Sequence, residues 1–496
     1  MFDYNPMLLT DFYKTIHYKL YPENSNKIYS YWIPRQSRLE YDKVVVFGIQ
    51  AFIQEYLIDY FNKYFFEKDI NEILREYMRL IEYTFNSNII IEDLNHIKKL
   101  HKLGYLPLEI KAIKEGSLVN IGIPIIEVSN TDNEYFWLVN YLETLLSSSI
   151  WHPMTSATIS YMFRNIVNKY YNISSDIKTK HGAMGDFSLR GQTSINSGIA
   201  SSAAFLTSFS KTATIPSILY LEKYYNCDIK SEIVGTGTPS TEHSVMCSYG
   251  KENEFEVYEK ILDIYKSGPI SIVSDTYDYW NVLTNFIPRL KDKIMLRKGK
   301  VLIRGDSGNP VDIVCGNEYS DNINERKGTV EILWDLFGGT INSKGYKVLD
   351  SHIGCIYGDA ITLQRAEEIY TKLINKGFSV ENVALGVGSY SLQYVTRDTF
   401  GFAMKATHLE YKNNEFIALF KDPITSKDTV KKSPKGICYV YKIGEQYHLM
   451  DNFNSESIKL VEYNNQLETI FKNGVIMRKQ SLKNIRNILH SYSGGF

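Results

Sequence analysis

The sequence predicts an α/β fold: an irregular, TIM-like α/β barrel with a second α+β domain built from the N- and C-terminal segments. The chain has 496 residues, 44% of them hydrophobic, which is enough to bury the cores of two or three domains. From about residue 180, short apolar runs alternate with segments of helical period, as in a parallel sheet or barrel. After about residue 400 short strands return. We therefore expect residues 1–165 plus 400–496 to form the discontinuous α+β domain and residues 166–399 the barrel.

The first part of the chain mixes strand and helix patterns. Residues 27–33 alternate as a strand does, and the apolar residues of 49–60 fall on one helical face. Residues 108–128 are β-rich, with Gly116 and Gly122 as turn or bulge points, and Pro124 suggests an edge strand. Residues 131–134 are typical of a capping box, which predicts a helix running through Leu145.

The middle of the chain has the βαβα rhythm. We expect buried strands at 270–273, 301–303, 354–357 and 382–385, and helices near 251–266, 327–338 and 361–376. After residue 400, further strands are expected at 416–420 and 437–441. The order of these elements favours two discontinuous domains over two consecutive ones.

Polar or glycine residues follow nearly every predicted middle strand. The carboxyl ends of barrel strands converge on one mouth, so these residues would meet in one cleft. Asp and Gly also end strands routinely, so an ordinary turn remains the alternative for each one. The four strands run into Ser274-Asp275, Arg304-Gly305-Asp306-Ser307-Gly308, Gly358-Asp359 and Gly386-Val387-Gly388-Ser389.

Composition excludes several classes of protein. Lys+Arg 55 against Asp+Glu 56 gives a net charge of -1, which argues against nucleic-acid binding. No apolar stretch is long enough for a transmembrane helix, and Met1 to Asn5 do not resemble a signal peptide. Five cysteines are widely spread without a CxxC pair, so neither a disulfide framework nor a zinc ribbon is expected. We expect a cytoplasmic protein that binds neither membrane nor nucleic acid.

Two motifs suggest phosphate binding. Gly386 to Ser389 precede a helix-capable stretch at 392–398, and glycines at a helix start let backbone N–H groups approach a phosphate. Several cations are spaced so that they can converge on one mouth, which suits a substrate with more than one phosphate. A solvated surface charge is the alternative for each of them, which are Arg190, Arg304, Arg397, Lys405 and Lys421.

Other side chains have chemical capacity. His243 follows Glu242, and a neighbouring carboxylate can fix the histidine tautomer or make the ring more nucleophilic. Phe187, ahead of Arg190 and Gly191, can offer a ring face to an aromatic base, although a phenylalanine is ordinarily part of the core. Asp275, Asp306 and Asp359 can hold magnesium through water or bind sugar hydroxyls.

These segments together resemble the type II phosphoribosyltransferase family that acts on nicotinamide and nicotinate. The resemblance covers almost the full length, and its specificity lies in the order and spacing of the blocks. They are Thr10-Asp11-Phe12-Tyr13-Lys14 with His17-Tyr18-Lys19 and Tyr21-Pro22, Asp186-Phe187 with Arg190-Gly191, Glu242-His243-Ser244, Val273 to Asp278, Ile303 to Pro310, Thr396-Arg397-Asp398, and Phe420-Lys421-Asp422-Pro423.

The resemblance implies a pentosyltransferase of NAD salvage. Nicotinamide would displace pyrophosphate from phosphoribosyl pyrophosphate and give nicotinamide mononucleotide, through an oxocarbenium-like transition state that needs positioning and charge stabilisation. Mg²⁺, bridged mainly by the substrate, would neutralise the leaving group, and ATP would act as co-substrate through a phosphohistidine. The resemblance also implies a homodimer with shared active sites.

The resemblance assigns a role to each site residue. His243 would be phosphorylated from ATP, with Asp275 and Glu242 supporting it. Phe187 would stack on one face of the base, and Tyr13 from a second subunit would cover the other. Arg304 would hold the carboxamide oxygen, with Asp11 and Ala213 also at the base. Asp306 and Asp359 would bind ribose or metal, and the phosphates would be held by Gly358, Gly388, Ser389, Arg190, Arg397, Lys405, Lys421 and Arg35.

The sequence departs from the family pattern at the base pocket. In the family an aspartate follows the threonine of a Phe-x-Gly-Thr segment and accepts the amide of nicotinamide. Here that segment is Phe209-Ser210-Lys211-Thr212-Ala213, so the acidic position is Ala213. Losing the acceptor weakens amide recognition by on the order of 1–3 kcal/mol if nothing replaces it. Gly185, Leu189, Gly305 and Ser389 stand where the family has His, Tyr, Pro and Gly.

Three alternatives remain at this point. The same chemistry on nicotinate or another base is motivated by Ala213. A barrel hydrolase with paired carboxylates explains Asp275, Asp306 and Asp359 but gives the arginines and His243 no role. A sensor that binds phosphoribosyl pyrophosphate without turnover gives no role to His243, Glu242 and Asp275.

Overall fold

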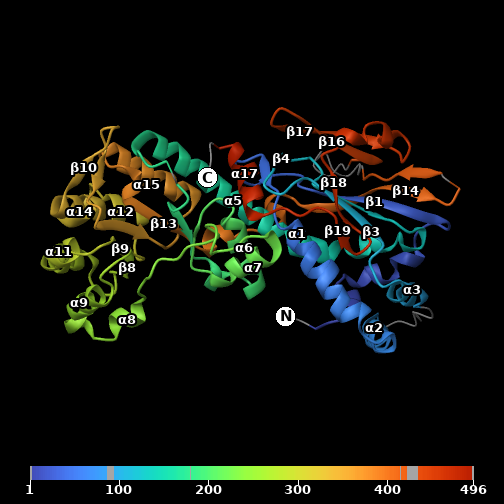
Figure 1. The fold of residues 1–496 in the computed structure, drawn as a ribbon, viewed down its shortest axis with the longest axis horizontal. Coiled ribbons are helices and arrows are strands. Elements are labelled where there is room, and N and C mark those ends of the chain that lie inside the picture. Colours follow the sequence, from blue (N-terminus) through green and yellow to red (C-terminus); the bar gives the residue numbers. More distant parts are fainter. Residues whose placement is uncertain (1–2, 86–93, 179, 414, 422–433, 494–496) are drawn as a thin grey trace. The chain divides into compact units, whose positions relative to one another are not determined.

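The computed structural model divides the chain into two compact units, each described here by itself (Figure 1). Unit 1 comprises Met1–Thr158, Leu221–Cys227 and Val395–Tyr492, and unit 2 comprises Ile159–Tyr220, Asp228–Tyr394 and Ser493–Phe496. The structure describes residues 3–85, 94–178, 180–413, 415–421 and 434–493. Within these residues no helix is both long and apolar enough to cross a membrane.

Unit 1 is built on a seven-stranded antiparallel sheet in the order β15-β14-β1-β5-β3-β18-β19. Three strands come from the first part of the chain and four from the last, so the sheet joins both ends of the sequence. The strands are β1 (Ser25–Ile33), β3 (Leu108–Ala112), β5 (Ile126–Asn130), β14 (Ala403–Tyr411), β15 (Phe416–Ala418), β18 (Glu468–Lys472) and β19 (Val475–Ile476).

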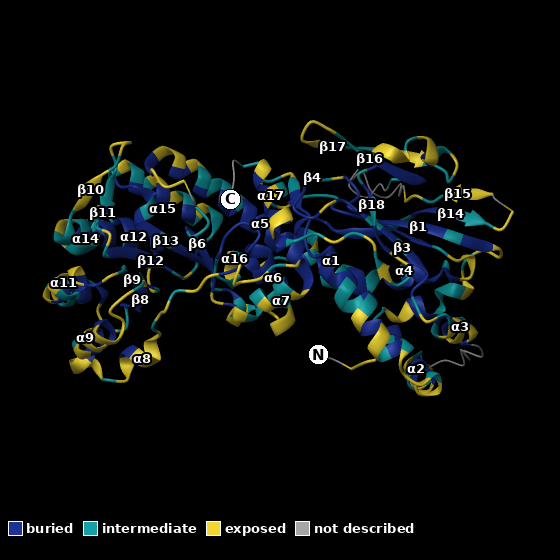
Figure 2. Cartoon of the chain, in the orientation of Figure 1, coloured by how far each residue is buried: buried dark blue, intermediate teal, exposed yellow. Residues whose placement is uncertain are grey.

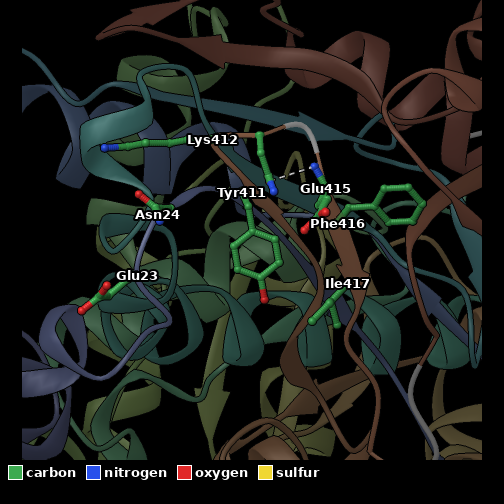
Figure 3. Close-up of a pocket in the computed structure, with 8 residues that line it drawn as sticks. Glu23, Asn24, Tyr411, Lys412, Glu415, Phe416 and Ile417 are labelled. Carbon is green, nitrogen blue, oxygen red and sulfur yellow. Dashed lines mark hydrogen bonds between the residues drawn. The ribbon is translucent and has the colours of Figure 1, made fainter.

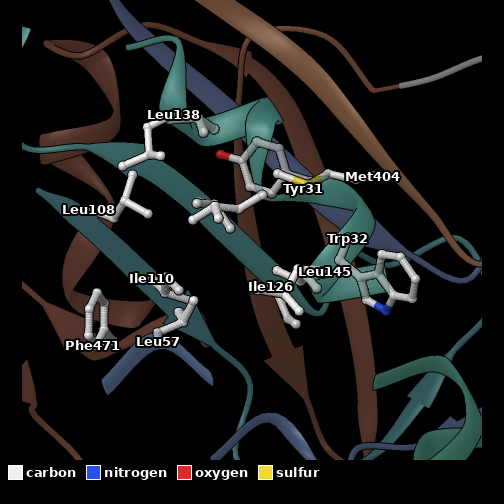
Figure 4. Packing of buried hydrophobic residues seen from close by; sticks show 14 of the residues in the cluster. Tyr31, Trp32, Leu57, Leu108, Ile110, Ile126, Leu138, Leu145, Met404 and Phe471 are labelled. Atoms are coloured by element: carbon white, nitrogen blue, oxygen red, sulfur yellow. The ribbon is translucent and has the colours of Figure 1, made fainter. Parts of the chain in front are cut away.

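The core of unit 1 lies against this sheet. Tyr31, Trp32, Ile126 and Met404 pack together with apolar side chains of the helices (Figure 4). Burial of this apolar surface is the main term that stabilises the unit. The first helix runs as α1 (Ile49–Phe52) and continues with π-type hydrogen bonds through η3 (Ile53–Tyr60) and η4 (Asn62–Phe66), followed by α2 (Ile70–Phe85) and α3 (Asn95–Leu103).

Two short sheets complete the strands of unit 1. The hairpin of β16 (Ile437–Ile443) and β17 (Gln446–Phe453) includes the strand expected at 437–441, and β2 (Lys43–Val45) pairs with β4 (Leu118–Asn120). Gly116 and Gly122 have the positive φ angles of turn residues, as expected. The edge position suggested by Pro124 is wrong. The proline precedes β5, and β5 lies between β1 and β3 inside the sheet.

The capping prediction at 131–134 is one residue early. Asp132, rather than Thr131, caps the short helix η5 (Asn133–Tyr135), and its side chain accepts the Glu134 N–H at 2.9 Å. The chain then forms α4 (Leu138–Tyr141) and the long helix α5 (Glu143–Ser174), so helical structure extends far beyond Leu145. The helix does not end at Leu145, because apolar residues continue along the buried face of α5.

Unit 2 contains a six-stranded parallel sheet in the order β7-β6-β13-β12-β9-β8. Four of its strands, β8, β9, β12 and β13, carry apolar runs and are mostly buried, as in sheets covered by helices (Figure 2), whereas β6 and β7 are short and mixed. The six strands are β6 (Met184–Asp186), β7 (Lys211–Thr212), β8 (Ile270–Val273), β9 (Val301–Gly305), β12 (Ile353–Tyr357) and β13 (Val383–Val387).

The sheet of unit 2 is curled. One extended segment makes single parallel bridges to both edge strands, from Thr236 to Lys211 of β7 and from Ser240 to Ser271 of β8. The α/β prediction is confirmed by this curled parallel sheet. A complete TIM barrel is not, since six paired strands form the sheet in the described part of the chain.

Helices connect the strands of unit 2 and lie around the sheet (Figure 1). The three helices expected from periodicity are confirmed as α9 (Glu254–Ile264), α14 (Thr329–Phe337) and α15 (Leu363–Asn375). The helix expected at 392–398 is wrong: α16 (Ser389–Leu392) ends at the first residue of that stretch, and only η10 (Arg397–Thr399) follows. Further helices in this part of the chain are α6 (Ile195–Phe205), α7 (Ile215–Tyr225), α8 (His243–Cys247), α10 (Tyr279–Asn281), α11 (Ile287–Met295), α12 (Pro310–Cys315) and α13 (Ile323–Lys327).

Candidate active site

The carboxyl ends of the parallel strands of unit 2 gather the chemically capable residues, as strand-end convergence predicts. Asp275 follows β8, Asp306 follows β9, Asp359 lies just past β12, and Phe187 follows β6. In this geometry residues far apart in sequence become neighbours, and hydrogen bonds, ion pairs or close approaches join most of them.

Phe187 lies over a floor of glycines. A methyl group built on Gly386 would lie 2.3 Å from the Phe187 ring, and one on Gly358 would lie 3.2 Å from it. The Phe187 N–H donates to the Val387 carbonyl at 2.9 Å, which continues the pairing of β6 with β13. Glycine is therefore required at 386, because any side chain there would displace the aromatic ring.

Arg304 and Asp306 lie beside this floor. Arg304 Nε is 3.1 Å from Asp306 Oδ2, and both side chains are largely buried. Asp306 Oδ1 is 3.0 Å from the methyl position of Gly358, so the carboxylate adjoins the same glycine as the Phe187 ring. Burial raises the pKa of Asp306, and Asp275 and Asp359 raise it further, while Arg304 and His243 act in the opposite direction.

Asp275 connects this group to His243. Its Oδ2 accepts the Asp306 N–H at 3.1 Å and the Ser307 hydroxyl at 2.5 Å. Its Oδ1 faces His243 Nε2 at 3.7 Å, while His243 Nδ1 is 3.2 Å from the Thr276 hydroxyl. The imidazole is exposed and the carboxylate is 5% exposed, so the ring is held from one side and open on the other.

The partner of His243 differs from the one suggested by sequence proximity. In the described part of the chain, the Glu242 carboxylate makes no hydrogen bond to the imidazole. It accepts the Ser244 hydroxyl instead. Asp275 and Thr276, brought from the end of β8, orient the ring. Thr276 was missed in the sequence because a single threonine beside an aspartate carries no distinctive pattern.

The glycine turn after β13 adjoins the Arg190 segment. A methyl group on Gly191 would lie 2.0 Å from the Ser389 hydroxyl oxygen, so η6 (Leu189–Gly191) packs directly on the start of α16. Gly388 precedes α16, and no atom lies within 4 Å of its methyl position. Exposed Arg190 therefore stands next to an open stretch of backbone at the carboxyl end of the sheet.

Ala213 follows β7 and is exposed, and its N–H donates to the Asp186 carbonyl at 2.9 Å. The neighbouring acid, Asp186, is fully buried and accepts hydrogen bonds from Ser188, Thr212 and Thr214. Asp186 is therefore structural, and the edge beside Ala213 has no carboxylate of its own.

The remaining predicted phosphate ligands cluster in unit 1. Burial lowers the pKa of Lys405, and the positive charges of Arg35, Lys421 and Arg397 lower it further. Lys405 lies on β14 opposite Tyr31 of β1, and Arg35 follows β1, with its Nε donating to the Gly401 carbonyl at 3.0 Å. Four cations near enough for their charges to act on Lys405 are suited to a highly charged anion. Asp422 and Pro423 lie outside the described residues.

The N-terminal block also lies in unit 1. The Asp11 carboxylate accepts hydrogen bonds from the Tyr13 hydroxyl at 3.1 Å and the Thr144 hydroxyl at 2.7 Å. The Tyr13 ring is 55% exposed, and Lys14 behind it is buried and paired with Glu143 at 2.7 Å. The Tyr13 ring therefore points outward from a segment that the Asp11 hydrogen bonds and the Lys14–Glu143 ion pair hold in place.

Two further features of the described residues bear on the site. No group of three or more His, Cys, Asp and Glu side chains gathers there as a metal-ligand set. A hollow in unit 1 is lined by Glu23, Asn24, Tyr411, Lys412 and residues of β15 (Figure 3). It contains none of the predicted site residues, so it is separate from the cation cluster around Lys405.

Comparison with known proteins defines the class first. The chain has the fold of a nicotinate-nucleotide pyrophosphorylase from Pyrococcus furiosus, with a TM-score of 0.57, 14% identity and 99% of this chain and 96% of the other covered. Human nicotinic acid phosphoribosyltransferase gives the same TM-score of 0.57 at 13% identity, covering 98% and 93%. The fold of this chain is therefore that of these two proteins.

Sequence comparison then gives the family. The model of the nicotinate phosphoribosyltransferase (NAPRTase) family matches residues 182–474, and that of the nicotinamide phosphoribosyltransferase N-terminal domain matches residues 5–110. A nicotinamide phosphoribosyltransferase of Acinetobacter baylyi is 41% identical over 98% of this chain and 97% of its own. One from Mycoplasma genitalium is 33% identical over 88% and 95%. This chain belongs to the nicotinate phosphoribosyltransferase family.

Proposed function

We propose that this chain is a nicotinamide phosphoribosyltransferase of NAD salvage. The ring nitrogen of nicotinamide would attack the anomeric carbon of phosphoribosyl pyrophosphate as the bond to pyrophosphate breaks, which gives nicotinamide mononucleotide and pyrophosphate. The relatives that carry this name support the proposal along nearly the whole chain. The observation that carries it is the Phe187 ring on its glycine floor, beside Arg304 and Asp306.

Binding and orientation account for most of the proposed catalysis. The Phe187 ring would stack on the pyridine and Arg304 would hold the carboxamide oxygen, so the ring nitrogen is aimed at the sugar. Asp306 and Asp359 would bind the ribose hydroxyls. Gly358, Gly388, Ser389 and Arg190 would hold phosphate at the end of the sheet, with Arg35, Arg397, Lys405 and Lys421 as the second set of phosphate ligands.

Magnesium fits this site only as a substrate-bridged ion. The described acids form no complete ligand set, while Asp306 and Asp359 offer carboxylate oxygens of the kind that Mg²⁺ prefers. When bound, the ion would neutralise the charge of the pyrophosphate leaving group.

We further propose that His243 takes a phosphoryl group from ATP. The exposed imidazole, with Asp275 at one nitrogen and Thr276 at the other, is oriented for this transfer. Asp275 stabilises the positively charged ring, and the bond from phosphorus to the ADP oxygen would break as the bond to histidine nitrogen forms. Hydrolysis of this group would couple ATP to product formation.

We also propose how the sheet closes and how the subunits assemble. The curled sheet would be the wall of an irregular barrel, and the enzyme would be a cytoplasmic homodimer in which Tyr13 of one subunit covers the base held by its partner. The exposed Tyr13 ring supports this arrangement. Sedimentation of the purified chain would test the dimer.

A second base is favoured by one observation. Ala213 leaves the edge of the sheet without the carboxylate that would repel nicotinate. The test is a side-by-side assay of both bases with phosphoribosyl pyrophosphate, in which mononucleotide and pyrophosphate are quantified. Conversion of nicotinamide supports the proposal, whereas conversion of nicotinate alone contradicts it, and pyrophosphate release without any base would indicate a hydrolase.

A further inference from the structure

The concave face of the sheet in unit 2 has two lysines to which the proposed function gives no role. Lys211 of β7 pairs with Gly185, and its Cβ is 3.3 Å from the methyl position of that glycine. Lys300 immediately precedes β9, and its Cδ is 3.1 Å from the methyl position of Gly354. Both side chains are half-buried.

Strand alternation places both lysines on the face that carries the base site. Lys300 and Leu302 meet the same methyl position at Gly354, so they share a face, and Arg304 and Asp306 follow on that face at intervals of two. Gly185, which meets Lys211, also meets Cε1 of Phe187 at 3.3 Å. Both lysines therefore face the interior, with Lys211 at the level of Gly185 and Lys300 at the amino end of β9, on the same face as Arg304.

Neither ammonium group has an ion pair within the residues that the structure describes. Lys211 Nζ makes a long contact of 3.5 Å with the Thr238 hydroxyl. Burial lowers the pKa of Lys211, and so does the charge of Lys300; burial lowers the pKa of Lys300, against which Glu381 and Asp350 act from a distance. Asp186 points to the other face and is already fully hydrogen-bonded. Half-burial of two cations that have no direct ion pair is costly.

Ser271 adds a hydroxyl to the same interior. It pairs with Leu302 across β8 and β9, so its side chain lies on the face of Lys300. The residue is 1% exposed and its Oγ has no hydrogen-bond partner among the described residues. A buried hydroxyl of this kind is unusual, because such groups are normally satisfied.

We propose that these four residues, Lys211, Lys300, Ser271 and Thr238, form an inner lysine surface that binds a carboxylate. Two ammonium groups and the Ser271 hydroxyl donate to its oxygens, and the lack of side chains at Gly185 and Gly354 lets the stems of the two lysines reach the interior. The carboxylate is either the ring substituent of a pyridine base stacked on Phe187, which rests on the proposed function, or a separate small carboxylate.

The test is calorimetric titration of the full-length protein with nicotinate, with nicotinamide as the neutral match, and with formate. The variants are Lys211→Met and Lys300→Met, with Lys211→Arg to retain the charge. Lys298→Met is the matched control, because Lys298 is exposed and lies two residues before Lys300. Each methionine variant removes one ammonium group from the same surface, so if one of them misfolds, the other still tests the proposal.

We expect both methionine variants to weaken carboxylate binding by about tenfold or more, while nicotinamide binding changes by less than about twofold. Loss confined to nicotinate identifies the base as the source. Loss of formate binding that is independent of nicotinamide identifies a separate carboxylate. Equal carboxylate binding by wild type and both variants, or an equal loss in Lys298→Met, overturns the proposal. Absence of mononucleotide from either base would instead count against the proposed function, since the titrations do not depend on turnover.

Discussion

The Nε2 atom of His243 faces the Oδ1 atom of Asp275 across 3.7 Å, although 31 residues separate the two in the chain, from 243 at the start of α8 to 275 at the end of β8. The contact exists because the parallel strand delivers its terminal carboxylate to the same edge as the helix start. The histidine is thereby oriented by an acid that is not its neighbour in sequence.

Replacing His243 by alanine should abolish the stimulation of product formation by ATP and leave basal transfer in place, because in the proposed mechanism the imidazole accepts the phosphoryl group and has no role in binding the base. The measurement is the initial rate with and without ATP. His352→Ala is the control, since His352 forms a similar pair with Asp350 at 2.7 Å, at the opposite ends of the strands. ATP stimulation that survives in His243→Ala would remove the histidine from this role.

The raised pKa of Asp306 predicts an acid limb in the pH profile of kcat/KM above the ordinary aspartate range. The ionised form binds substrate, so activity is lost as pH falls through the raised value. Asp359→Asn removes one negative neighbour and should move the limb to lower pH, whatever it does to the maximum. A limb that stays in place would mean that another group controls it.

The same shift has a consequence for stability. Because the folded pKa of Asp306 exceeds the unfolded one, the folded state holds more protons between these two values, and stability contributed by this residue falls as pH rises across that window. Asp306→Asn should make the melting temperature depend less on pH in that window. A steeper dependence in the variant would contradict the assignment.

Gly386→Ala should displace the Phe187 ring, since the new methyl group would lie 2.3 Å from it. Overpacking of this kind costs about 1–3 kcal/mol, and we expect the KM for the base to rise as well. Thermal unfolding and base kinetics are the measurements, with Gly237→Ala as the stability control because its methyl position is open. Addition of Phe187→Leu should recover stability but not base binding; absence of such coupling would show that the ring does not rest on Gly386.

Lys405→Met should raise the KM for phosphoribosyl pyrophosphate by roughly tenfold or more, because a hydrogen bond to a charged group contributes about 1.5–3 kcal/mol. The KM for the base should change little. Lys114→Met is the control, an exposed lysine paired with Glu468 elsewhere in unit 1. Equal effects of the two variants would show that the cation cluster does not bind the phosphates.

Ala213→Asp should shift the preference toward nicotinamide and away from nicotinate, since a carboxylate at this exposed position accepts an amide N–H and repels an anion. The ratio of kcat/KM for the two bases is the measurement. Ala213→Asn, which is uncharged, should shift it less. An unchanged ratio would mean that residue 213 does not face the base.

Sequence patterns were sufficient where one periodicity dominated. The four apolar runs of the middle region became β8, β9, β12 and β13, and the polar residues after them meet at one edge as predicted. Boundaries failed where tertiary contacts decide: α16 ends at Leu392, although residues 393–398 have no strong helix breaker. β5 is interior although a proline precedes it, because the proline lies outside the paired residues.

The candidate site shows the same division. Strand ends and short motifs located Phe187, Asp275, Asp306 and Arg304, and the family resemblance predicted both Asp275 and Glu242 as supports of His243. The fold shows the contact with Asp275, while the Glu242 carboxylate accepts the Ser244 hydroxyl. Lys211 had no motif of its own, and only the register of β7 with β6 places it beside Gly185 and the Phe187 ring. Inward and outward positions on a two-residue strand cannot be assigned from alternation alone.

The pairing of β1 with β14 in unit 1 has a consequence for biosynthesis. On one side β1 pairs with β5, but on the other side it pairs with β14, and the Tyr31 hydroxyl accepts the Cys438 N–H at 2.9 Å, so this second edge finds its partners only after the strands of unit 2 have been made. The nascent N-terminal strand must wait, with its hydrogen-bonding edge open, while the intervening parallel sheet is made. Ribosome-associated chaperones would therefore be expected to bind this chain early and release it only near the end of translation.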